Sequence, residues 1–161
     1  MDIQFRKLQK MSEADQCARM MTESDPWKKL RIGYNDSIQL LMDPSKEVYL
    51  ARIQDEIAGF IFIEMTGTFR GYVKSIGVMP KWRNQEIGTR LLKFAEERIF
   101  RETPNVFICV STFNKKAQKF YKRFGYLKVG KLKDFVVNGH TELLLRKTIA
   151  PINEFNKEND I

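Results

Sequence analysis

The sequence predicts an α+β fold in which a β-sheet carries helices on both faces. Short segments with alternating or continuous apolar residues are typical of strands. Longer segments with an apolar residue every three or four positions are typical of helices. Glycine, proline, aspartate and asparagine separate these segments, as expected at turns. The predicted order of elements is β-α-α-β-β-β-α-β-α-β-β.

The strands are predicted from the period of their apolar residues and from the turn residues that bound them. The last two strands flank an Asn138-Gly139 turn, a dipeptide that favours hairpins. The strands are expected at Ile3–Leu8, Glu47–Ile53, Ile57–Met65, Tyr72–Val78, Val106–Val110, Tyr126–Lys131 and Glu142–Arg146.

The helices are predicted from apolar stripes and from residues that favour helix ends. Ser12 can cap the first helix, with Asp15 in the position of a weak capping box. Ser24-Asp25-Pro26 places a capping residue before a proline at the start of the second. Asn114 can cap the fourth, and Gly125 is suited to end it. The first three helices are expected at about Ser12–Met21, Pro26–Leu41 and Gln85–Phe100.

Size and composition suit a single domain. The chain has 161 residues, of which 43% are hydrophobic, enough for one core. The domain is expected over residues 1–150, followed by a polar tail at 151–161 that is frayed over Asn153–Asp160. No apolar run is long enough to span a membrane, and the N-terminus lacks the apolar core of a signal peptide. A cytoplasmic location with no membrane partner is therefore expected.

Cysteine spacing and net charge narrow the choice of partners. Cys17 and Cys109 lie far apart and outside any ligand cluster, so free buried thiols and no metal are expected. The net charge of +8 favours either nucleic acid or a phosphate-rich cofactor, and a solvated basic surface explains it equally well. The sequence has no helix-turn-helix or aromatic-basic pattern, which disfavours nucleic acid. A homodimer is compatible with the sequence.

The stretch from Arg83 to Gly88 has the pattern of a phosphate-binding loop. It lies between a strand that ends at Val78 and a long amphipathic helix. A helix N-terminus offers free N–H groups and partial positive charge. Gly88 lets the backbone approach a ligand closely, and Arg90 adds positive charge nearby. Alone the pattern is weak, because one glycine before a helix usually marks only a turn.

Two longer motifs contain this loop and a later helix. The first is Ile76-Gly77-Val78-Met79-Pro80, followed by Trp82-Arg83-x-x-x-Ile87-Gly88-Thr89-x-Leu91-Leu92, and the second is Asn114-x-x-Ala117-x-x-Phe120-Tyr121-x-x-x-Gly125-Tyr126. The first resembles the coenzyme A motif of the GNAT superfamily of N-acetyltransferases, Gln/Arg-x-x-Gly-x-Gly/Ala, and the second resembles that family's Asn-to-Gly helix. The resemblance implies a GNAT-like, mixed and mostly antiparallel sheet. It also implies a splayed pair of parallel strands that end near Val78 and Val110.

The resemblance also implies acetyl-CoA as cosubstrate and gives roles to site residues. Backbone groups of Ile76, Gly77 and Val78 would pair with the pantetheine arm and polarise the thioester carbonyl. Asn114 would hydrogen-bond the pantetheine. Tyr121 would give a proton or a hydrogen bond to the departing sulfur, and a purely structural core role for Tyr121 is the alternative. The pyrophosphate would be held by Arg83 and by the amides of Asn84, Gln85, Glu86, Ile87, Gly88 and Thr89.

Glu86 departs from the family pattern, because the family usually has its first glycine at this position. The cradle uses main-chain N–H groups, which glutamate supplies as well as glycine does. An inward carboxylate ~6 Å from the pyrophosphate would be repelled by about 3 kcal/mol at an effective dielectric of ~20. We therefore expect Glu86 to be outward, in the helical region and near Arg90, in a site that it weakens.

The general base and the acceptor are less well defined. In the branch that acetylates protein N-termini, a glutamate lies five residues before the motif asparagine, and here Cys109 stands there. Glu64 is the first candidate for a catalytic base. Glu142 is the second, and it is also a candidate for binding the acceptor. His140 is expected to be a turn residue, since direct transfer needs no Cys109–His140 nucleophilic pair. Trp27 and Tyr34 are predicted on one face of the second helix, where they either belong to the core or line the acceptor mouth.

The sequence is interpreted as an acetyl-CoA-dependent N-acetyltransferase that moves an acetyl group directly to a primary amine of unknown identity. One alternative is a GNAT-fold module that binds acyl-CoA without turnover, which Glu86 and the missing base would favour. A second alternative is a basic nucleic-acid-binding domain.

Overall fold

The computed structural model describes residues 2–158, with side chains described as far as residue 155. Its strands form a mixed sheet in the order β1-β2-β3-β4-β5-β7-β6. The strands are β1 (Gln4–Lys7), β2 (Glu47–Ile53), β3 (Glu56–Glu64), β4 (Tyr72–Val78), β5 (Asn105–Ser111), β6 (Leu127–Lys133) and β7 (Thr141–Thr148). The helices are α1 (Met11–Glu23), α2 (Tyr34–Met42), η1 (Pro80–Trp82), α3 (Ile87–Ile99), α4 (Lys115–Arg123) and α5 (Ile152–Glu158).

The predicted fold class is confirmed. The pairs β1–β2, β2–β3, β5–β7 and β6–β7 are antiparallel, whereas β4 and β5 are parallel. The parallel ladder pairs Tyr72 with Phe107 and Val73 with Ile108, at the beginning of both strands. The splaying of the two strands beyond these residues stays a prediction.

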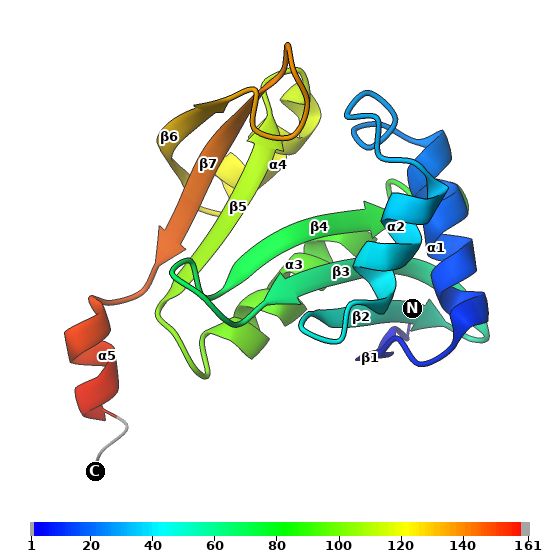
Figure 1. The fold of residues 1–161 in the computed structure, drawn as a ribbon. Coiled ribbons are helices and arrows are strands. Elements are labelled where there is room, and N and C mark those ends of the chain that lie inside the picture. The colour runs from blue at the N-terminus through cyan, green and yellow to red at the C-terminus, as the bar shows by residue number, and fades with distance from the viewer. Residues whose placement is uncertain (1, 159–161) are drawn as a thin grey trace. The chain divides into compact units, whose positions relative to one another are not determined.

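The chain divides into two compact units (Figure 1). Unit 1 comprises residues 2–64 and 74–95, and unit 2 comprises residues 65–73 and 96–158. The division falls within β4 and within α3, so each of these elements belongs partly to each unit. The prediction that residues 1–150 act as one domain remains a prediction.

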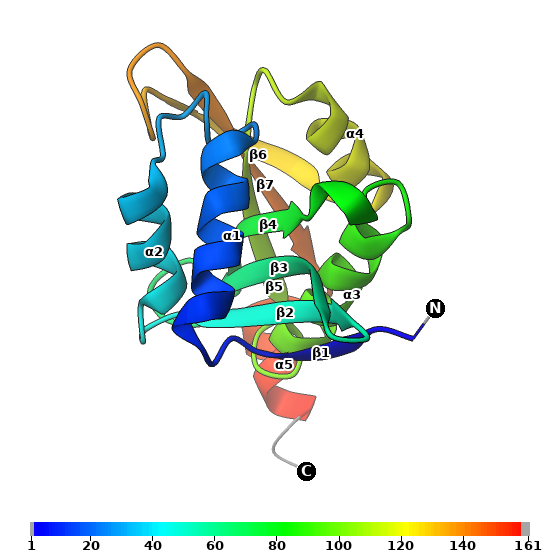
Figure 2. The same cartoon turned by 90° about the vertical axis from the view of Figure 1, so that its right-hand side faces the viewer.

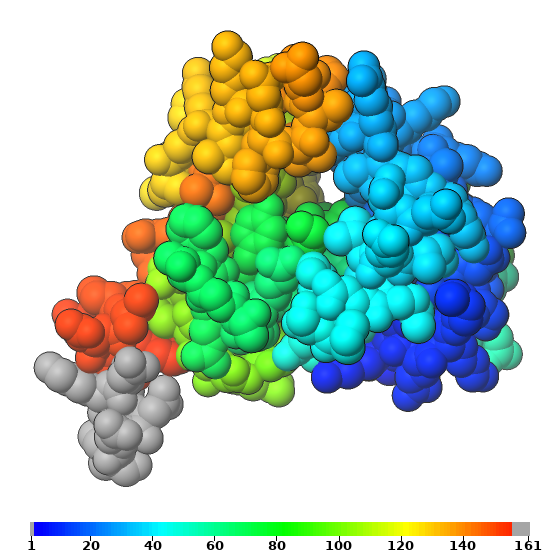
Figure 3. Space-filling view, in the orientation of Figure 1, coloured from blue at the N-terminus to red at the C-terminus, as the bar shows by residue number. Residues whose placement is uncertain are grey.

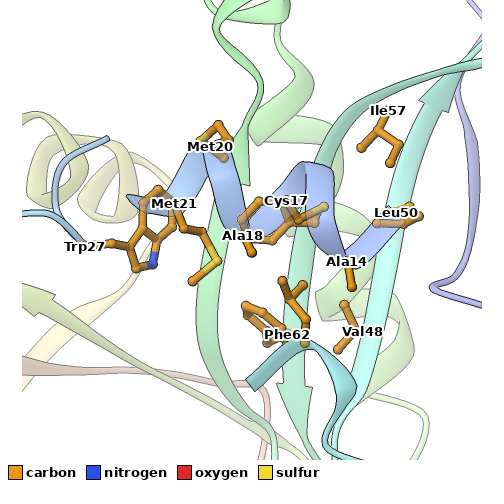
Figure 4. Close-up of a cluster of buried hydrophobic side chains, with 12 residues drawn as sticks. Ala14, Cys17, Ala18, Met20, Met21, Trp27, Val48, Leu50, Ile57 and Phe62 are labelled. Carbon is orange, nitrogen blue, oxygen red and sulfur yellow. The ribbon is translucent and has the colours of Figure 1, made fainter. Parts of the chain in front are cut away.

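In unit 1, helices cover both faces of the strands. Figure 2 shows α1 and α2 on one side of β1–β3 and the first turns of α3 on the other. Because both faces of β3 are covered, all of its residues except the two terminal ones are buried. Figure 4 shows the side chains of α1 that point toward β2 and β3, among them Cys17 and Met21. The buried cluster consists of Ala14, Cys17, Ala18, Met20, Met21, Trp27, Leu41, Val48, Leu50, Ile57, Phe60 and Phe62.

Two glycines allow β3, β4 and α3 to approach closely. A Cβ at Gly59 would lie 2.6 Å from the carbonyl oxygen of Gly77 and 2.8 Å from a methyl group of Leu91. A Cβ at Gly77 would lie 2.5 Å from the ring of Phe60. All three separations are shorter than carbon–carbon and carbon–oxygen contact allows, so these two positions need glycine. The backbone of the Ile76-Gly77-Val78 motif therefore packs directly on the core.

The prediction of one helix from Pro26 to Leu41 is wrong. The chain forms turns from Ser24 to Arg31, and α2 begins only at Tyr34. Arg31 has a φ of 57°, in the left-handed region, and this value interrupts helical hydrogen bonding. The capping pattern before Pro26 therefore opens a short turn rather than a long helix.

The start of α1 also differs from the prediction. Glu13, not Asp15, occupies the third position of the helix and accepts the backbone N–H groups of Gln9 and Lys10 at 3.0 and 3.2 Å. Asp15 accepts hydrogen bonds from Arg19 and Tyr34 instead. The helix begins at Met11, one residue before the predicted Ser12.

In unit 2, β5, β6 and β7 pack against α4, which Figure 2 shows on one side of β6 and β7. The first buried residues of β5, Val106 and Ile108, alternate with half-buried ones. β6 is an edge strand with three lysines and exposed Leu127 and Val129, a composition that discourages edge pairing. Figure 3 shows the β6–β7 connection at the surface, where Gly139 has a φ of 89° in the predicted turn.

The prediction of a frayed tail is wrong for the part of the tail that the structure describes. Ile152–Glu158 forms the helix α5, whereas residues 159–161 lie outside the described part of the chain. Cys17 is buried, as predicted, whereas Cys109 is only half-buried. Among residues 2–158, no helix has the length and apolar character needed to cross a membrane.

Candidate active site

The loop between β4 and α3 has the geometry of an anion-binding helix start. β4 ends at Val78, the single turn η1 follows, and α3 begins at Ile87. The first hydrogen bond of this helix runs from the N–H of Arg90 to the carbonyl of Glu86, at 3.0 Å. The amides of Ile87, Gly88 and Thr89 precede this bond, so they have no intrahelical acceptor. They are the donors that a phosphate group at a helix N-terminus accepts from.

Glu86 is exposed, as predicted, but its backbone is not helical. Its φ is 61°, and Asn84 has a φ of 60° in the same loop. Left-handed conformations cost L-residues roughly 1–2 kcal/mol, and glycine adopts them without that cost. The positive φ gives a physical reason for a glycine at this position of the family motif. The expectation of a helical Glu86 was wrong because the loop must turn sharply before α3 begins.

Arg83 hydrogen-bonds the loop to the end of β4 and to the end of α1, both in unit 1. Its Nε donates to the carbonyl of Val78 at 3.2 Å, and one of its terminal nitrogens donates to the hydroxyl of Ser24 at the end of α1, also at 3.2 Å. Gln85 closes the loop from the other side, since its side-chain amide donates to the carbonyl of Lys81 at 3.1 Å. These bonds hold the backbone that carries the free amides.

In unit 2, Asn114 caps α4 as predicted. Its side-chain oxygen accepts the N–H of Ala117 at 3.1 Å, and Gly125 follows the helix with a φ of 90°. Gln118 donates to the carbonyls of Ser111 and Thr112, at 3.1 and 3.0 Å, and so fixes the turn between β5 and α4. Asn114 also carries a side-chain NH₂ group, which is a donor that capping does not use.

Tyr121 lies on the buried face of α4. Its ring packs against Phe120 and Tyr126, with centroids 5.3 and 5.9 Å away, and burial raises the pKa of its phenol above the ordinary value of 10. It is therefore protonated at neutral pH. No hydrogen bond to its hydroxyl is formed within residues 2–158, and no buried side-chain oxygen or nitrogen of that range lacks a partner. The hydroxyl of this buried ring therefore reaches the molecular surface.

The two candidate bases have different surroundings. Glu64 lies 3.4 Å from the ammonium of Lys46 and 3.8 Å from that of Lys74, an arrangement that favours a structural ion pair. Glu142 is buried, with 4% of its surface exposed, and accepts a hydrogen bond from the hydroxyl of Ser111. Burial raises the pKa of the Glu142 carboxyl. A raised carboxyl pKa is the direction in which enzymes adjust a base that works near neutral pH.

The candidate acceptor residues Trp27 and Tyr34 do not share a helix. Trp27 lies in the turn before α2, is buried against Phe60, and donates its indole N–H to the hydroxyl of Ser75 at 2.8 Å. Tyr34 is 38% exposed and donates to Asp15 at 2.7 Å, which joins α2 to α1. Both side chains have structural partners within unit 1.

Comparison with known proteins supplies the family. Residues 8–126 match the model of the Acetyltransferase (GNAT) family, and this range contains both sequence motifs. The chain belongs to the GNAT family. It is therefore an acetyltransferase, and the predicted family membership is confirmed.

Named relatives of this GNAT chain act on amines. It is 33% identical over 117 residues to the aminoalkylphosphonate N-acetyltransferase of Salmonella typhimurium strain LT2, a match that covers 68% of this chain and 73% of the relative. Its fold is similar to an aminoglycoside 6'-N-acetyltransferase complexed with coenzyme A (TM-score 0.71, 21% identity, 94% and 98% of the two chains). It is also similar to Arabidopsis thaliana NAA60 in complex with a bisubstrate analogue (TM-score 0.75, 16% identity, 92% and 98%).

Sequence reasoning did not find several residues that position the site of this GNAT protein. Ser75 and Ser111 meet their partners from other segments of the chain, at separations of 48 and 31 residues. No local pattern marks such a contact, because it depends on which strands and turns become neighbours. The sequence did carry a signal for Gln118, because this residue lies in the same motif helix as Asn114 and Tyr121.

Glu86→Gly is expected to tighten coenzyme A binding in this GNAT protein. The substitution relieves the left-handed backbone and removes a negative charge, and an outward carboxylate ~10 Å from the pyrophosphate costs a few tenths of a kcal/mol to ~1.5 kcal/mol. Calorimetric titration of coenzyme A into the wild type, Glu86→Gly and Glu86→Gln at two salt concentrations measures both effects. The charge effect should shrink at high salt, whereas the backbone effect should not.

Glu86→Gln separates the two contributions, because it removes the charge and keeps a side chain at a φ of 61°. Glu86→Gly should also raise the unfolding free energy by up to ~1 kcal/mol, since relief of the left-handed conformation outweighs the added freedom of the unfolded chain. A large loss of coenzyme A affinity in Glu86→Gln would show that the carboxylate makes a necessary contact.

Proposed function

We propose that this chain transfers the acetyl group of acetyl-CoA directly to a primary amine. The observation that carries the proposal is the start of α3, where Ile87, Gly88 and Thr89 offer free amides after the loop that follows β4 and η1. Membership of the GNAT family supports it, and the family match runs through both units. A cytoplasmic location stays a prediction.

In unit 1, the proposed work is to hold the cosubstrate. The amides of the loop and of the first turn of α3 would bind the pyrophosphate. Backbone groups of Ile76, Gly77 and Val78 would pair with the pantetheine and polarise the thioester carbonyl. The close packing of Gly77 on Phe60 supports this role, because it gives the backbone a fixed position.

In unit 2, Tyr121 is proposed as the group that stabilises the departing thiolate, with Asn114 as a partner of the pantetheine. A phenol of pKa ~10 facing a thiol of pKa ~8.5 loses a proton uphill by roughly 2 kcal/mol, and burial of Tyr121 makes the transfer harder still. Tyr121 would therefore donate a hydrogen bond first and transfer its proton late, as the carbon–sulfur bond breaks. Its free hydroxyl supports the role.

The acceptor is proposed to be a small molecule with a primary amine. The name of the curated relative points to aminoalkylphosphonates, and the name of the coenzyme A-bound structure points to aminoglycosides. The net charge of +8 supports an anionic acceptor such as a phosphonate over a polycationic one. Amine nucleophiles must be neutral to attack, and for a lysine-type amine at pH 7 deprotonation costs about 4.6 kcal/mol.

The test is turnover of acetyl-CoA with a panel of amines. The panel contains an aminoalkylphosphonate, an aminoglycoside, an alkyl diamine and a peptide with a free N-terminus. Release of free thiol, together with the mass of the acetylated product, should identify the phosphonate as the best acceptor. Binding of coenzyme A with no thiol release from any amine would instead support the module that binds acyl-CoA without turnover.

A further inference from the structure

Three glutamates of the described residues are buried, and they differ in what surrounds them. Glu13, Glu96 and Glu142 are 5%, 9% and 4% exposed. An ionised carboxylate in such a place is costly unless cations or several donors compensate it. The partners of each carboxylate therefore indicate whether it serves the fold.

Two of the three are compensated by cations. Glu13 contacts the guanidinium groups of Arg6 and Arg52 and accepts two backbone N–H groups. Glu96 accepts from the ammonium of Lys147 at 2.8 Å and from the hydroxyl of Tyr126 at 2.9 Å. Each carboxylate joins several elements of its own unit, which is a structural role.

The buried charge of Glu142 is offset by fewer partners than the charges of Glu13 and Glu96. Its one hydrogen-bond partner is the Ser111 hydroxyl, which donates to Oε1, and no lysine or arginine of residues 2–158 forms an ion pair with it. The strands beside it place Ser111 opposite on β5 and Leu132 opposite on β6, and His140 lies in the turn just before β7 begins at Thr141. Among the described residues, His140 is the one titratable group whose charge lowers the pKa of the Glu142 carboxyl, and the Phe113 ring packs on the His140 ring with centroids 5.2 Å apart.

The second oxygen of Glu142 is open. Ser111 occupies Oε1, and no buried side-chain oxygen in the described part of the chain lacks a partner. Oε2 therefore reaches the molecular surface although the rest of the side chain is buried. A buried carboxylate with one open oxygen has the form of a binding site for a cation that the protein itself does not supply.

The position of Glu142 connects it with the cosubstrate motif. The backbone carbonyl of Ser111 accepts the N–H of Asn114 at 2.9 Å, and the side chain of Gln118 bonds the same carbonyl. Ser111 therefore holds Glu142 through its hydroxyl and Asn114 through its backbone. The last residue of β5 therefore connects Glu142 with the turn that presents the motif asparagine, within unit 2.

We propose that Glu142 is the group that binds the ammonium of the acceptor and removes its proton, and that Ser111 is its positioning residue. This proposal rests on the proposed acetyl transfer. The ammonium gives one proton to Oε2, which leaves a neutral amine and a carboxylic acid. The nitrogen lone pair then forms a bond to the acetyl carbon, and the carbon–sulfur electron pair leaves with sulfur as Tyr121 donates its proton. The nitrogen of the product then carries one proton too many and gives it to the Tyr121 phenolate, which leaves the neutral amide. Glu142 releases its proton to water.

The chemistry of the acceptor offers a direct test. One amine that the wild type acetylates is compared with an analogue that carries enough β-fluorine atoms to lower its amine pKa below the assay pH, so that it is mostly neutral there. Glu142→Gln is expected to lower kcat/KM for the parent amine by 100-fold or more, in line with general base catalysis. The loss should be less than ten-fold for the fluorinated amine, which needs no base. Glu97→Gln, an exposed acid on α3, is the matched control and should leave both values unchanged.

Stability provides a readout that does not depend on activity. Burial raises the pKa of Glu142 above its unfolded value, so the folded state disfavours the charged carboxylate as the pH rises above the unfolded pKa, and this cost is absent below it. Glu142→Gln should therefore melt at the same temperature as the wild type or higher. Glu96→Gln should melt lower, because it breaks a compensated pair. A lower melting temperature for Glu142→Gln would assign Glu142 to the fold and overturn the proposal.

Ser111→Ala tests the positioning role without removing the carboxylate. The Ser111 hydrogen bond lowers the Glu142 pKa, so its loss should move the acid limb of the kcat/KM profile for the parent amine, which depends on the base, to higher pH. An unmoved limb, or equal losses for the two amines in Glu142→Gln, would overturn the proposal. If Glu64→Gln, and not Glu142→Gln, lowers kcat/KM strongly for the parent amine and little for the fluorinated amine, the role of base belongs to Glu64. If the wild type releases no thiol with any amine, the proposed function fails, and that result is distinct from all of these.

Discussion

Tyr121→Phe lowers kcat by ten-fold or more and leaves the affinity for acetyl-CoA nearly unchanged. The substitution removes only the hydroxyl, which within residues 2–158 has no hydrogen-bond partner and reaches the surface. The thiolate would then leave without a donor, and acid catalysis typically contributes about 10²–10⁴ in rate. Steady-state turnover with saturating amine, together with calorimetric titration of coenzyme A, measures both quantities.

Tyr126→Phe is the matched control for Tyr121→Phe. Tyr126 is also a buried tyrosine of unit 2, but its hydroxyl donates to the Glu96 carboxylate at 2.9 Å. Its loss should lower the unfolding free energy by about 1.5–3 kcal/mol, the usual worth of a hydrogen bond to a charged group. Tyr121→Phe should leave stability unchanged. An unchanged kcat in Tyr121→Phe, with chemistry shown to be rate-limiting, would remove Tyr121 from the mechanism.

Glu13→Gln lowers the unfolding free energy by about 2–3 kcal/mol at pH 7. The hydrogen bond from Arg6, together with the N–H groups of Gln9 and Lys10, outweighs burial and lowers the Glu13 pKa from 4.5 to about 2. A difference of this size corresponds to roughly 3 kcal/mol, which we reduce slightly because Arg6 is partly exposed. Urea denaturation of the two proteins at several pH values measures it.

The pH dependence of the Glu13 effect has a definite sign. The folded-state pKa lies below the unfolded one, so the stabilisation is complete above about pH 4.5 and is lost as the pH falls toward 2. The difference between wild type and Glu13→Gln should narrow over that window. Glu97→Gln, which changes an exposed glutamate, should remain within about 0.5 kcal/mol of the wild type throughout. A difference that persists at pH 2 would mean that packing, and not charge, explains the loss.

The order of elements and most of their bounds were predictable from the sequence, because they depend on local patterns. Apolar periodicity located each strand, and the Asn114 cap and the left-handed Gly125 bounded α4 as expected. The error between Ser24 and Tyr34 shows where local signals are insufficient. A cap followed by proline fits a turn as well as a helix, and the tertiary contacts of Trp27 with Phe60 and Ser75 decide between them.

The sequence by itself determined the family and the residues of the two motifs, because backbone cradles and helix caps require particular residues at short spacings. It also led to the predictions of Tyr121 as the group that stabilises the thiolate and of Glu64 and Glu142 as candidate bases, which stay predictions. Only the tertiary structure decided the backbone conformation, the charged neighbours and the hydrogen-bond partners of these groups. The left-handed φ of Glu86, the ion pairs of Glu64 and the single hydroxyl partner of Glu142 all depend on neighbours brought together by folding. Burial and charge act through space, so residues distant in sequence set whether an acid supports the fold or is free to react.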